Sequence, residues 1–270
     1  MLLLIDAAGR FPLGTDGEPK LFDAPPAATE ITSRVHVTRE VTAARVHGVD
    51  AADLAGPGGA TGDARTHACH PLAARAVGLV NARERTRFDP ADGSEVRWGD
   101  GGIVARGATG RPIFPRLDPC VIGLVEDPKG ERILLVENAR RPGYLTLVAG
   151  YVDVGETLEA AFAREVWEET GRRVTGVRYL RSQPWPLSDA LMLGMAARTA
   201  DVDAQAPTDG ELTRTVWASR DELDSLTLAA EGTIARALID DWADTPPTPP
   251  TPPTPPTPQT PNPEGAHPWR

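Results

Sequence analysis

The chain has 270 residues, 40% of them hydrophobic and 24% charged, as expected for a folded protein of two small domains. Its formal net charge of −10 argues against non-specific binding to nucleic acid or anionic membranes. The two cysteines, Cys69 and Cys120, form no CxxC pair, and no apolar run approaches the roughly 18 residues of a membrane helix. We therefore expect no signal peptide, no membrane contact and a cytoplasmic location.

The first part of the chain predicts strands followed by a helix. The apolar run 2–5 and alternating stretches within 31–49 are typical of strands, and three- and four-residue apolar spacing over 72–87 predicts a helix. We expect a small β-rich N-terminal domain over 1–84 that ends in this helix. Residues 85–116, rich in Gly, Asp and Pro, read as a β-rich connector.

The second part mixes strands with two helices. Runs at 121–125 and 133–136 around a turn at 128–130 predict a β-hairpin, and 145–148 predicts a third strand. A helix is expected over 157–170, with Gly171 as its C-cap. Strands follow at 174–180, 191–197 and 215–218, and a last helix at 233–242. This order predicts an α/β sandwich with a mixed β-sheet over 117–244. The Thr-Pro-Pro repeat predicts a disordered tail over 245–270.

The helix 157–170 carries an unusual set of carboxylates. At about 100° per residue, Glu165, Glu168 and Glu169 fall within a roughly 100° arc of one face. The adjacent arc is suited to packing on a sheet and holds Phe162, Val166 and Thr170. Three like charges on one face repel each other, and a hard divalent cation such as Mg²⁺ or Mn²⁺ relieves that repulsion. The alternative is a solvated acidic face with ordinary salt bridges.

The stretch 150–171, GYVDVGETLEAAFAREVWEETG, resembles the Nudix box, Gly-x5-Glu-x7-Arg-Glu-apolar-x-Glu-Glu-x-Gly. The family pattern ends on an apolar residue, where this chain has Arg172. The resemblance implies a Nudix α/β/α sandwich and metal-dependent hydrolysis of a diphosphate. It implies catalytic roles for Glu156, Arg164, Glu165, Glu168 and Glu169. It implies a metal site formed by the Ala149 carbonyl, Glu165, Glu168, Glu169 and Glu211.

Downstream of this box, residues 182–192, SQPWPLSDALM, resemble the signature of the NADH pyrophosphatase branch of the family. Residues 182–186 match it, whereas Leu187, Ser188 and Ala190 depart from it. The likeness covers about residues 70 to 242 and implies NADH or NAD as substrate, with AMP and a nicotinamide mononucleotide as products. Trp185 and Tyr151 offer stacking surfaces and Gln183 offers amide hydrogen bonds. The implied substrate-binding residues are Phe114, Tyr151, Gln183, Pro184, Trp185, Pro186, Ala190, Met192 and Ala235.

One departure from most members of that branch is large. Their four-cysteine zinc ribbon aligns with Asp89, Asp92, Arg106 and Thr109, so we expect no structural zinc. The nearby His67, Cys69 and His70 match no common metal-site spacing.

Other activities remain open at this point. The resemblance also admits ADP-ribose, dinucleoside polyphosphates or NAD-capped RNA as substrate. A non-catalytic nucleotide sensor is a further alternative, motivated by the departures in the ribbon and signature. The complete set of repelling carboxylates argues against it. Members of the branch are dimers, so the resemblance also implies a homodimer.

Overall fold

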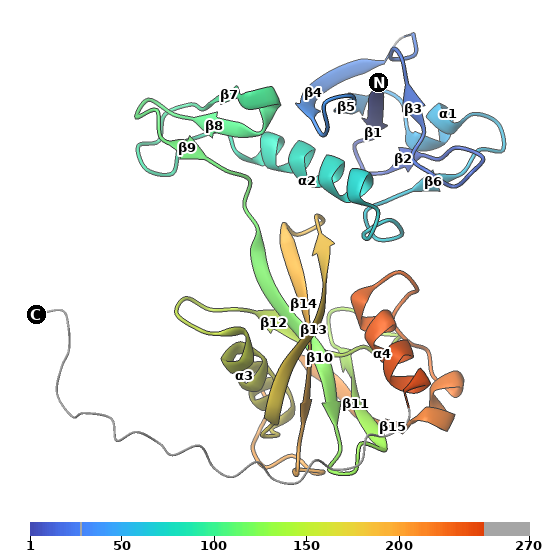
Figure 1. Cartoon of the computed structure of the whole chain (residues 1–270), viewed down its shortest axis with the longest axis vertical. Coiled ribbons are helices and arrows are strands. Elements are labelled where there is room, and N and C mark those ends of the chain that lie inside the picture. Colours follow the sequence, from blue (N-terminus) through green and yellow to red (C-terminus); the bar gives the residue numbers. More distant parts are fainter. Residues whose placement is uncertain (28, 246–270) are drawn as a thin grey trace, which may run out of the picture.

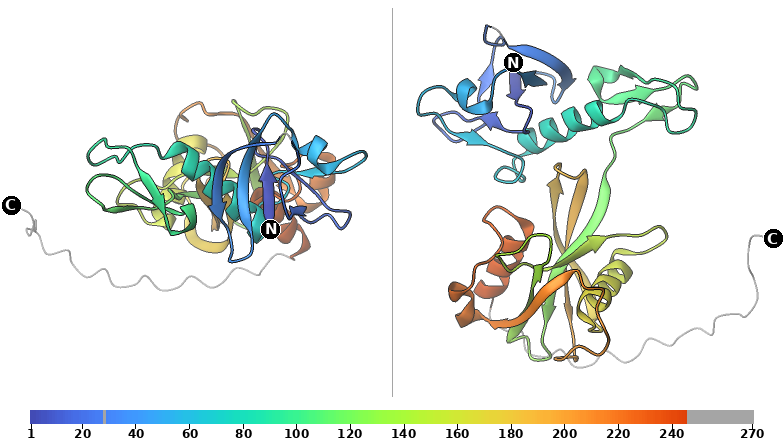
Figure 2. Two further views of the ribbon diagram at one scale, coloured as in Figure 1. Left: turned by 90° about the horizontal axis from the view of Figure 1, so that it is seen from above. Right: turned by 180° about the vertical axis from the view of Figure 1, so that it is seen from behind.

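The computed structural model describes residues 1–27 and 29–245; the predicted tail over 245–270 therefore lies, Thr245 apart, outside the described residues. Two folded parts are joined by a small three-stranded connector (Figure 1). The ends of two long strands of the C-terminal part point toward a helix of the N-terminal part, as Figure 2 also shows from behind. Within the described residues, no helix has the length and hydropathy needed to cross a membrane.

The N-terminal part is a four-stranded sheet with helices on both faces. Its order is β3 (Leu21–Phe22), β1 (Leu2–Ile5), β5 (Thr42–His47) and β4 (Glu30–His36), and β2 (Phe11–Pro12) pairs separately with β6 (Thr61–Gly62). Small apolar residues of α2 (Pro71–Arg85), among them Ala76 and Val80, pack against Leu3 and Val35. On the other face, Leu54 of α1 (Ala51–Ala55) packs against Leu4. This confirms the predicted β-rich N-terminal region.

The connector forms the sheet β7 (Arg97–Gly99), β8 (Val104–Arg106) and β9 (Pro112–Ile113), with the short helix η1 (Asp100–Gly102) between its first two strands. Three of the positions aligned with the zinc ribbon are joined by hydrogen bonds. Thr109 donates from its hydroxyl to the buried Asp89 at 3.5 Å and from its backbone N–H to Asp92 at 3.3 Å. The fourth, Arg106, contacts Asp100 instead. Hydrogen bonds thus join three of the four positions that align with the zinc ligands of the resembled branch.

The C-terminal part is a mixed six-stranded sheet between two helices (Figure 1). The path runs through β13 (Thr175–Trp185), β14 (Ala190–Arg198), β10 (Asp118–Glu126), β11 (Arg132–Asn138) and β15 (Leu212–Ser219), with β12 (Val148–Tyr151) also paired to β10. The β10–β14 pair is parallel and the other pairs are antiparallel. Helices α3 (Leu158–Thr170) and α4 (Ile234–Asp244) cover opposite faces, and η2 (Arg220–Ser225) precedes α4. The predicted α/β sandwich is confirmed.

The apolar runs of the central strands reflect burial on both faces. In β10, Val121 and Val125 pack in the cluster with Phe162 of α3, whereas Ile122 and Leu124 pack in the cluster with α4. Successive strand residues point to opposite faces, so a strand covered on both sides needs a continuous apolar run.

Two predicted strands are placed differently by the structure. The third strand was expected at 145–148, but the pairing segment is β12, which begins at Val148 and continues through Gly150 to Tyr151. Leu145 and Thr146 make only isolated bridges. The strand expected at 174–180 is longer: β13 extends to Trp185, because the signature segment pairs with β14 up to the Trp185–Ala190 position.

Candidate active site

Helix α3 places the predicted carboxylates on one face through their three- and four-residue spacing. Both ends of the helix are capped. The Thr157 side chain accepts the Ala160 N–H at the N-terminus, and Gly171 takes a left-handed conformation (φ 67°) at the C-terminus. Phe162 is buried against the sheet. The carboxylates differ sharply in exposure: the Glu168 side chain is 47% exposed, whereas Glu169 as a residue is 4% exposed.

Arg164 contacts two members of the carboxylate array, which comprises Glu165, Glu168 and Glu169 of α3. Its Nε and Nη2 donate to the two oxygens of Glu156 at 2.7 and 2.9 Å. Its Nη1 donates to Glu165 at 2.8 Å and to Glu168 at 2.9 Å, and Nη2 also reaches the Tyr151 carbonyl at 3.0 Å. The guanidinium lowers the pKa of Glu156 to about 2. A planar fork with five donors can hold several carboxylates in fixed orientations, and Arg164 thereby sets their rotamers.

Gly150 lets the array approach the sheet. A β-carbon at this position would overlap the carboxylate of Glu165, so only glycine admits that side chain against β12. Gly150 pairs with Val121 of the central strand β10. The glycine that opens the motif therefore leaves room for the Glu165 carboxylate in the orientation that Arg164 holds.

The negative charge around Glu169 is concentrated. Burial, together with the charges of Glu165, Asp209, Glu211 and Glu168, raises the pKa of this carboxyl to about 8. Burial likewise raises the pKa of Glu165. Asp209 is not part of the sequence prediction; its backbone N–H donates to the Glu168 carbonyl at 3.0 Å, and its side chain accepts the Glu211 N–H at 2.9 Å. Asp209 lies in the loop between β14 and β15, whose course cannot be predicted from the residues of the Nudix box.

This donor set suits a hard divalent cation chemically, since carboxylate oxygens dominate and their mutual repulsion is unrelieved around Glu169. As they stand, no three acidic, His or Cys side chains among the described residues are arranged to grip one ion. Arg164 instead donates through Nη1 to both Glu165 and Glu168. Their predicted role as ligands, with Ala149 and Glu211, stays a prediction.

Several predicted substrate-binding residues lie in one row across four strands. Tyr151 of β12 pairs with Cys120 of β10, Cys120 with Met192 of β14, and Met192 with Gln183 of β13. Ala149, two residues before Tyr151, packs with the α4-side core, as does Met192. Gly150, between Ala149 and Tyr151, faces Glu165 on the α3 side. Glu165 therefore lies on the α3 side of β12, whereas Met192 lies on the α4 side of the sheet.

Gln183 is committed to internal hydrogen bonds. It is 2% exposed; its Nε2 donates to the Gly232 carbonyl at 2.7 Å and to Cys69 Sγ at 3.2 Å. Its Oε1 accepts the Ile234 N–H at 2.8 Å, at the N-terminus of α4. The amide thus ties β13 to α4 and to the N-terminal part, where the sequence suggested a ligand contact.

The second half of the signature contacts the N-terminal part. The Pro186 carbonyl accepts a hydrogen bond from Asn81 of α2 at 3.1 Å, and Asp189 pairs with Arg85. Leu187 packs against the N-terminal core. The departures from the signature are therefore clustered at the turn where the two parts of the chain meet.

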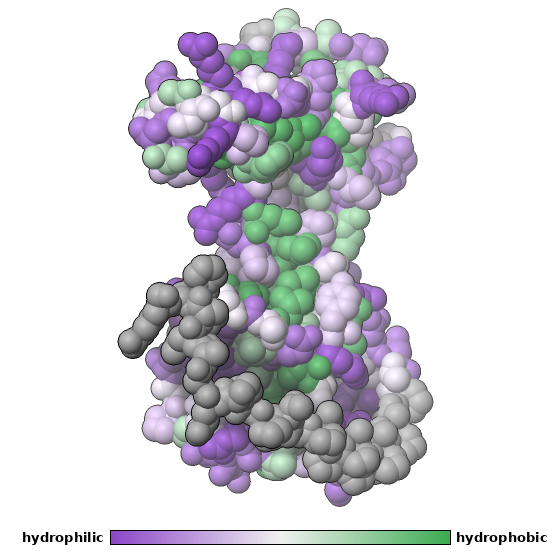
Figure 3. Space-filling view, turned by 60° about the vertical axis from the view of Figure 1, so that its left-hand side comes forward, coloured by the Kyte–Doolittle hydropathy of each residue, from purple (hydrophilic) through white to green (hydrophobic). Residues whose placement is uncertain are grey.

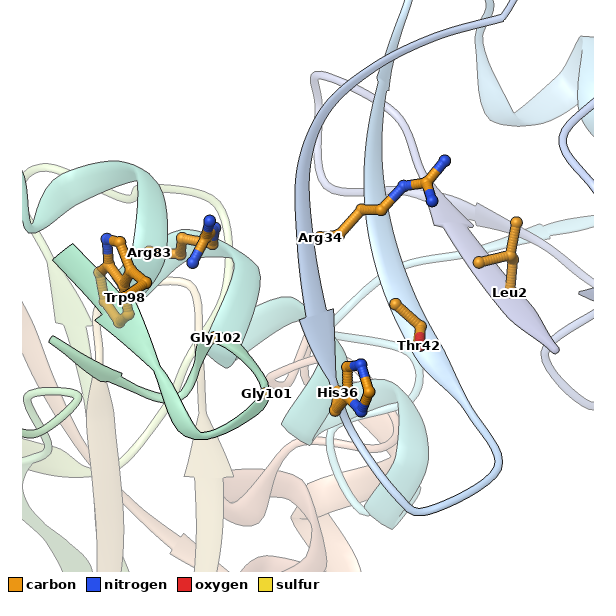
Figure 4. Close-up of a pocket in the computed structure, with 8 residues that line it drawn as sticks. All are labelled: Leu2, Arg34, His36, Thr42, Arg83, Trp98, Gly101 and Gly102. Carbon is orange, nitrogen blue, oxygen red and sulfur yellow. The ribbon is translucent and has the colours of Figure 1, made fainter.

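The remaining candidates differ in accessibility. Ala190, Ala235 and Pro186 are buried, Trp185 is half-buried and Pro184 is exposed. Phe114, in the segment between β9 and β10, is 66% exposed and is not enclosed with the others. A hollow of about 310 Å³ lies elsewhere, between the N-terminal sheet, α2 and β7 (Figure 4). In that view Arg34 points away from Arg83, so its cationic groups do not converge.

Comparison with known proteins adds to this geometry. A family model described as "NUDIX domain" matches residues 116–241. The chain is 33% identical over 261 residues to the "NAD-capped RNA hydrolase NudC" of Mycobacterium tuberculosis, covering 88% of this chain and 82% of that protein. It is 37% identical over 171 residues to the protein of the same name from Vibrio vulnificus, covering 63% of this chain and 64% of that one.

Among solved structures, the chain is similar to a NUDIX hydrolase from Nitrosomonas europaea. The TM-score is 0.46 at 20% identity, over 58% of this chain and 90% of that one.

Proposed function

The chain belongs to the Nudix hydrolase family, in its NudC branch, and we propose that it cleaves the pyrophosphate bond of NADH or NAD. The products are AMP and reduced or oxidised nicotinamide mononucleotide. The observation that carries this proposal is the carboxylate array of α3, oriented by Arg164 and brought against Gly150. The segment 182–186, which matches the dinucleotide signature and contributes Gln183 to the row of residues across the four strands, supports the dinucleotide as substrate.

In the proposed mechanism the chain supplies orientation and proton transfer. A bound Mg²⁺ or Mn²⁺, held by Glu165, Glu168, Glu169, Glu211 and the Ala149 carbonyl, would supply charge neutralisation for the diphosphate and a more acidic bound water. Arg164 and Glu156 hold the carboxylates in place. An exposed carboxylate, Glu168 or Glu211, accepts the proton of the attacking water.

The remaining predicted residues give the substrate its orientation in this proposal. Trp185 and Tyr151, neither of them buried, present aromatic surfaces on which a base or nicotinamide ring can stack. Phe114 supplies a third such surface from the connector side. We assign Gln183 a positioning role, because its side chain accepts the Ile234 N–H and so holds the N-terminus of α4.

NAD-capped RNA is a second candidate substrate, favoured by the names of the relatives in Mycobacterium tuberculosis and Vibrio vulnificus. The bond cleaved is chemically the same, so the array serves both substrates. The net charge of −10 gives no general attraction for the RNA chain.

The exposed apolar surface supports the expected homodimer. Large apolar side chains at the connector and around β12 are exposed: Phe114, Leu117, Tyr151 and Val154. Figure 3 shows apolar surface along the narrow part of the molecule between its two ends. Clustered exposed apolar side chains are typical of interaction surfaces. Light scattering coupled to size-exclusion chromatography tests this expectation; a monomer at micromolar concentration would contradict it.

The function is tested by incubating the full chain with NADH, NAD, ADP-ribose and NAD-capped RNA, with and without Mg²⁺ or Mn²⁺. Products are resolved by chromatography. We expect metal-dependent release of AMP and nicotinamide mononucleotide from NADH and NAD. Activity on ADP-ribose alone would retain the family chemistry and reject this substrate.

Two variants of α3 control the assay. Glu169→Gln removes the buried carboxylate and should lower kcat/KM by about a hundredfold or more, as expected when a metal ligand is lost. Glu159→Gln changes an exposed glutamate in the first turn of the same helix and should leave the activity unchanged. Equal activity of both variants would remove the array from the mechanism.

A further inference from the structure

On the α4 side of the C-terminal sheet, opposite α3, a pocket of about 280 Å³ has a strongly cationic lining. Four arginines from β13, β14 and η2 surround it, with two carboxylates: Arg178, Arg181, Arg198, Arg220, Glu126 and Asp241. The lining therefore carries two net positive charges in a protein whose net charge is −10. Such a local reversal of sign favours an anion.

One arginine is held rigidly at the pocket wall. Arg220 donates through Nη2 to the Thr245 carbonyl at 2.8 Å and through Nη1 to the Gly130 carbonyl at 3.2 Å. Its guanidinium also lies over the ring of Trp242, 3.8 Å from the centroid. These contacts fix its position with backbone acceptors and an aromatic face. Among the described residues, Arg220 forms no ion pair with a carboxylate.

Arg178 adds a second cation that no carboxylate neutralises. Among the described residues it has no ion pair, whereas Arg198 pairs with Glu126 at 3.1 Å and Arg181 with Asp241 at 3.1 Å. Arginine forks recognise oxyanions through two parallel hydrogen bonds.

The pocket also contains a buried donor without an acceptor. Trp242 lines the pocket and is 5% exposed, yet its indole N–H has no hydrogen-bond partner among the described residues. A buried N–H without a partner costs about 1–3 kcal/mol, and such groups are rare in native structures. Because this nitrogen is closed to solvent, it lies behind the pocket wall, where the indole can report on a ligand without contacting it.

We infer that this pocket binds a small phosphate-bearing ligand, with Arg178 and Arg220 contacting the phosphate and the Trp242 ring lying beneath Arg220. A pocket of about 280 Å³ has room for inorganic phosphate or a compact phosphate monoester. The site lies across the sheet from α3, and its lining includes none of the residues assigned to the proposed hydrolysis.

The indole N–H gives a direct readout. The ¹⁵N-labelled full chain, which has six tryptophans, is titrated with inorganic phosphate and, separately, with ribose 5-phosphate, while the indole N–H resonances are followed. Trp242→Phe identifies the Trp242 peak and keeps an aromatic ring beneath Arg220. We expect a saturable shift of that peak, and the tighter of the two probes shows whether the ligand is the free ion or a monoester.

Two charge variants complete the test. Arg178→Gln should weaken binding by about fivefold or more, as expected for the loss of a charge-assisted hydrogen bond. Arg111→Gln, an equal charge change at an exposed connector residue, should leave it unchanged. The proposal is overturned if the Trp242 peak fails to saturate by tens of millimolar probe, if sodium chloride of equal ionic strength shifts it equally, or if Arg178→Gln binds like the parent chain.

Discussion

Glu169 combines burial with crowded negative charge, which makes it costly to the fold without a bound cation. The pKa of this carboxyl is about 8 in the folded chain, against an ordinary value of 4.5. As pH rises between these values, the folded state loses stability, because the unfolded chain releases this proton first. We predict that Glu169→Gln raises the free energy of unfolding by about 1–3 kcal/mol at pH 8 in EDTA, and by much less at pH 5. Urea denaturation at both pH values checks this.

The same substitution should remove activity, so stability and function move in opposite directions. Glu159→Gln provides the matched comparison on α3. If Glu169→Gln were destabilising at pH 8, the buried carboxylate would be a structural element and its assignment to the metal would lose support.

Gln183 allows its structural and substrate-binding roles to be separated. Replacing it with Leu leaves the Ile234 N–H and the Gly232 carbonyl without their partner, so we expect a loss of about 1–3 kcal/mol in the free energy of unfolding. Thermal denaturation and the steady-state constants are measured on the same samples. Unchanged stability with a raised KM would instead return Gln183 to direct substrate contact.

The sequence predicted these residues unequally well. Glu165, Glu168 and Glu169 were accessible because helical periodicity and a fixed motif place them together locally. Asp209 reaches them only because the loop between β14 and β15 lies beside the C-terminal end of α3. No motif in the sequence around Asp209 predicts this position. The bonds of Gln183 join segments 114 and 51 residues apart, which no local pattern reveals.

At the scale of elements, the three longest helices were predicted closely, whereas the short α1 was not predicted. Gly171 is the C-cap of α3, as expected, and the first residues of two predicted helices, Thr157 and Thr233, are N-caps. Strands were less predictable, since a strand is defined by its partner. The apolar Leu145 and Leu147 suggested a strand, yet they are buried in irregular chain, and the pairing with β10 begins at Val148.

The connector offers an element-scale prediction. Asp89 is buried and accepts hydrogen bonds from the Ala91 N–H at 2.8 Å and from Thr109, which hold the loops in the absence of cysteines. Asp89→Ala leaves these donors unpaired and should lower the free energy of unfolding by about 1–3 kcal/mol. Differential scanning calorimetry measures the change, with the exposed Asp23→Ala as control.

Metal analysis belongs to the same experiment. We predict no stoichiometric zinc in the purified chain and no change in its melting temperature with a zinc-selective chelator in excess Mg²⁺. Bound zinc, or a melting temperature that falls with that chelator while Asp89→Ala remains neutral, would contradict this account of the connector.

In the whole molecule, the turn between β13 and β14 couples the two folded parts. Leu187 packs on the N-terminal core, while Asn81 and Arg85 of α2 bond to the same turn. We predict that Leu187→Ala loosens this contact and increases the rate of tryptic cleavage after Arg116, at the end of the connector. Gel electrophoresis of time points measures that rate. Val202→Ala, at an exposed apolar position elsewhere, is the control; equal rates for the two variants would show that the turn does not hold the parts together.

The central claim is hydrolysis at phosphorus within the pyrophosphate of NADH or NAD. The most direct measurement is mass spectrometry of the products formed from NADH in water enriched in oxygen-18, with Mg²⁺ or Mn²⁺ present. The account predicts AMP and reduced nicotinamide mononucleotide, one of them carrying a single solvent oxygen on its phosphate, and no products from Glu169→Gln. Release of nicotinamide, label outside the phosphates, or an equally active Glu169→Gln variant would contradict it.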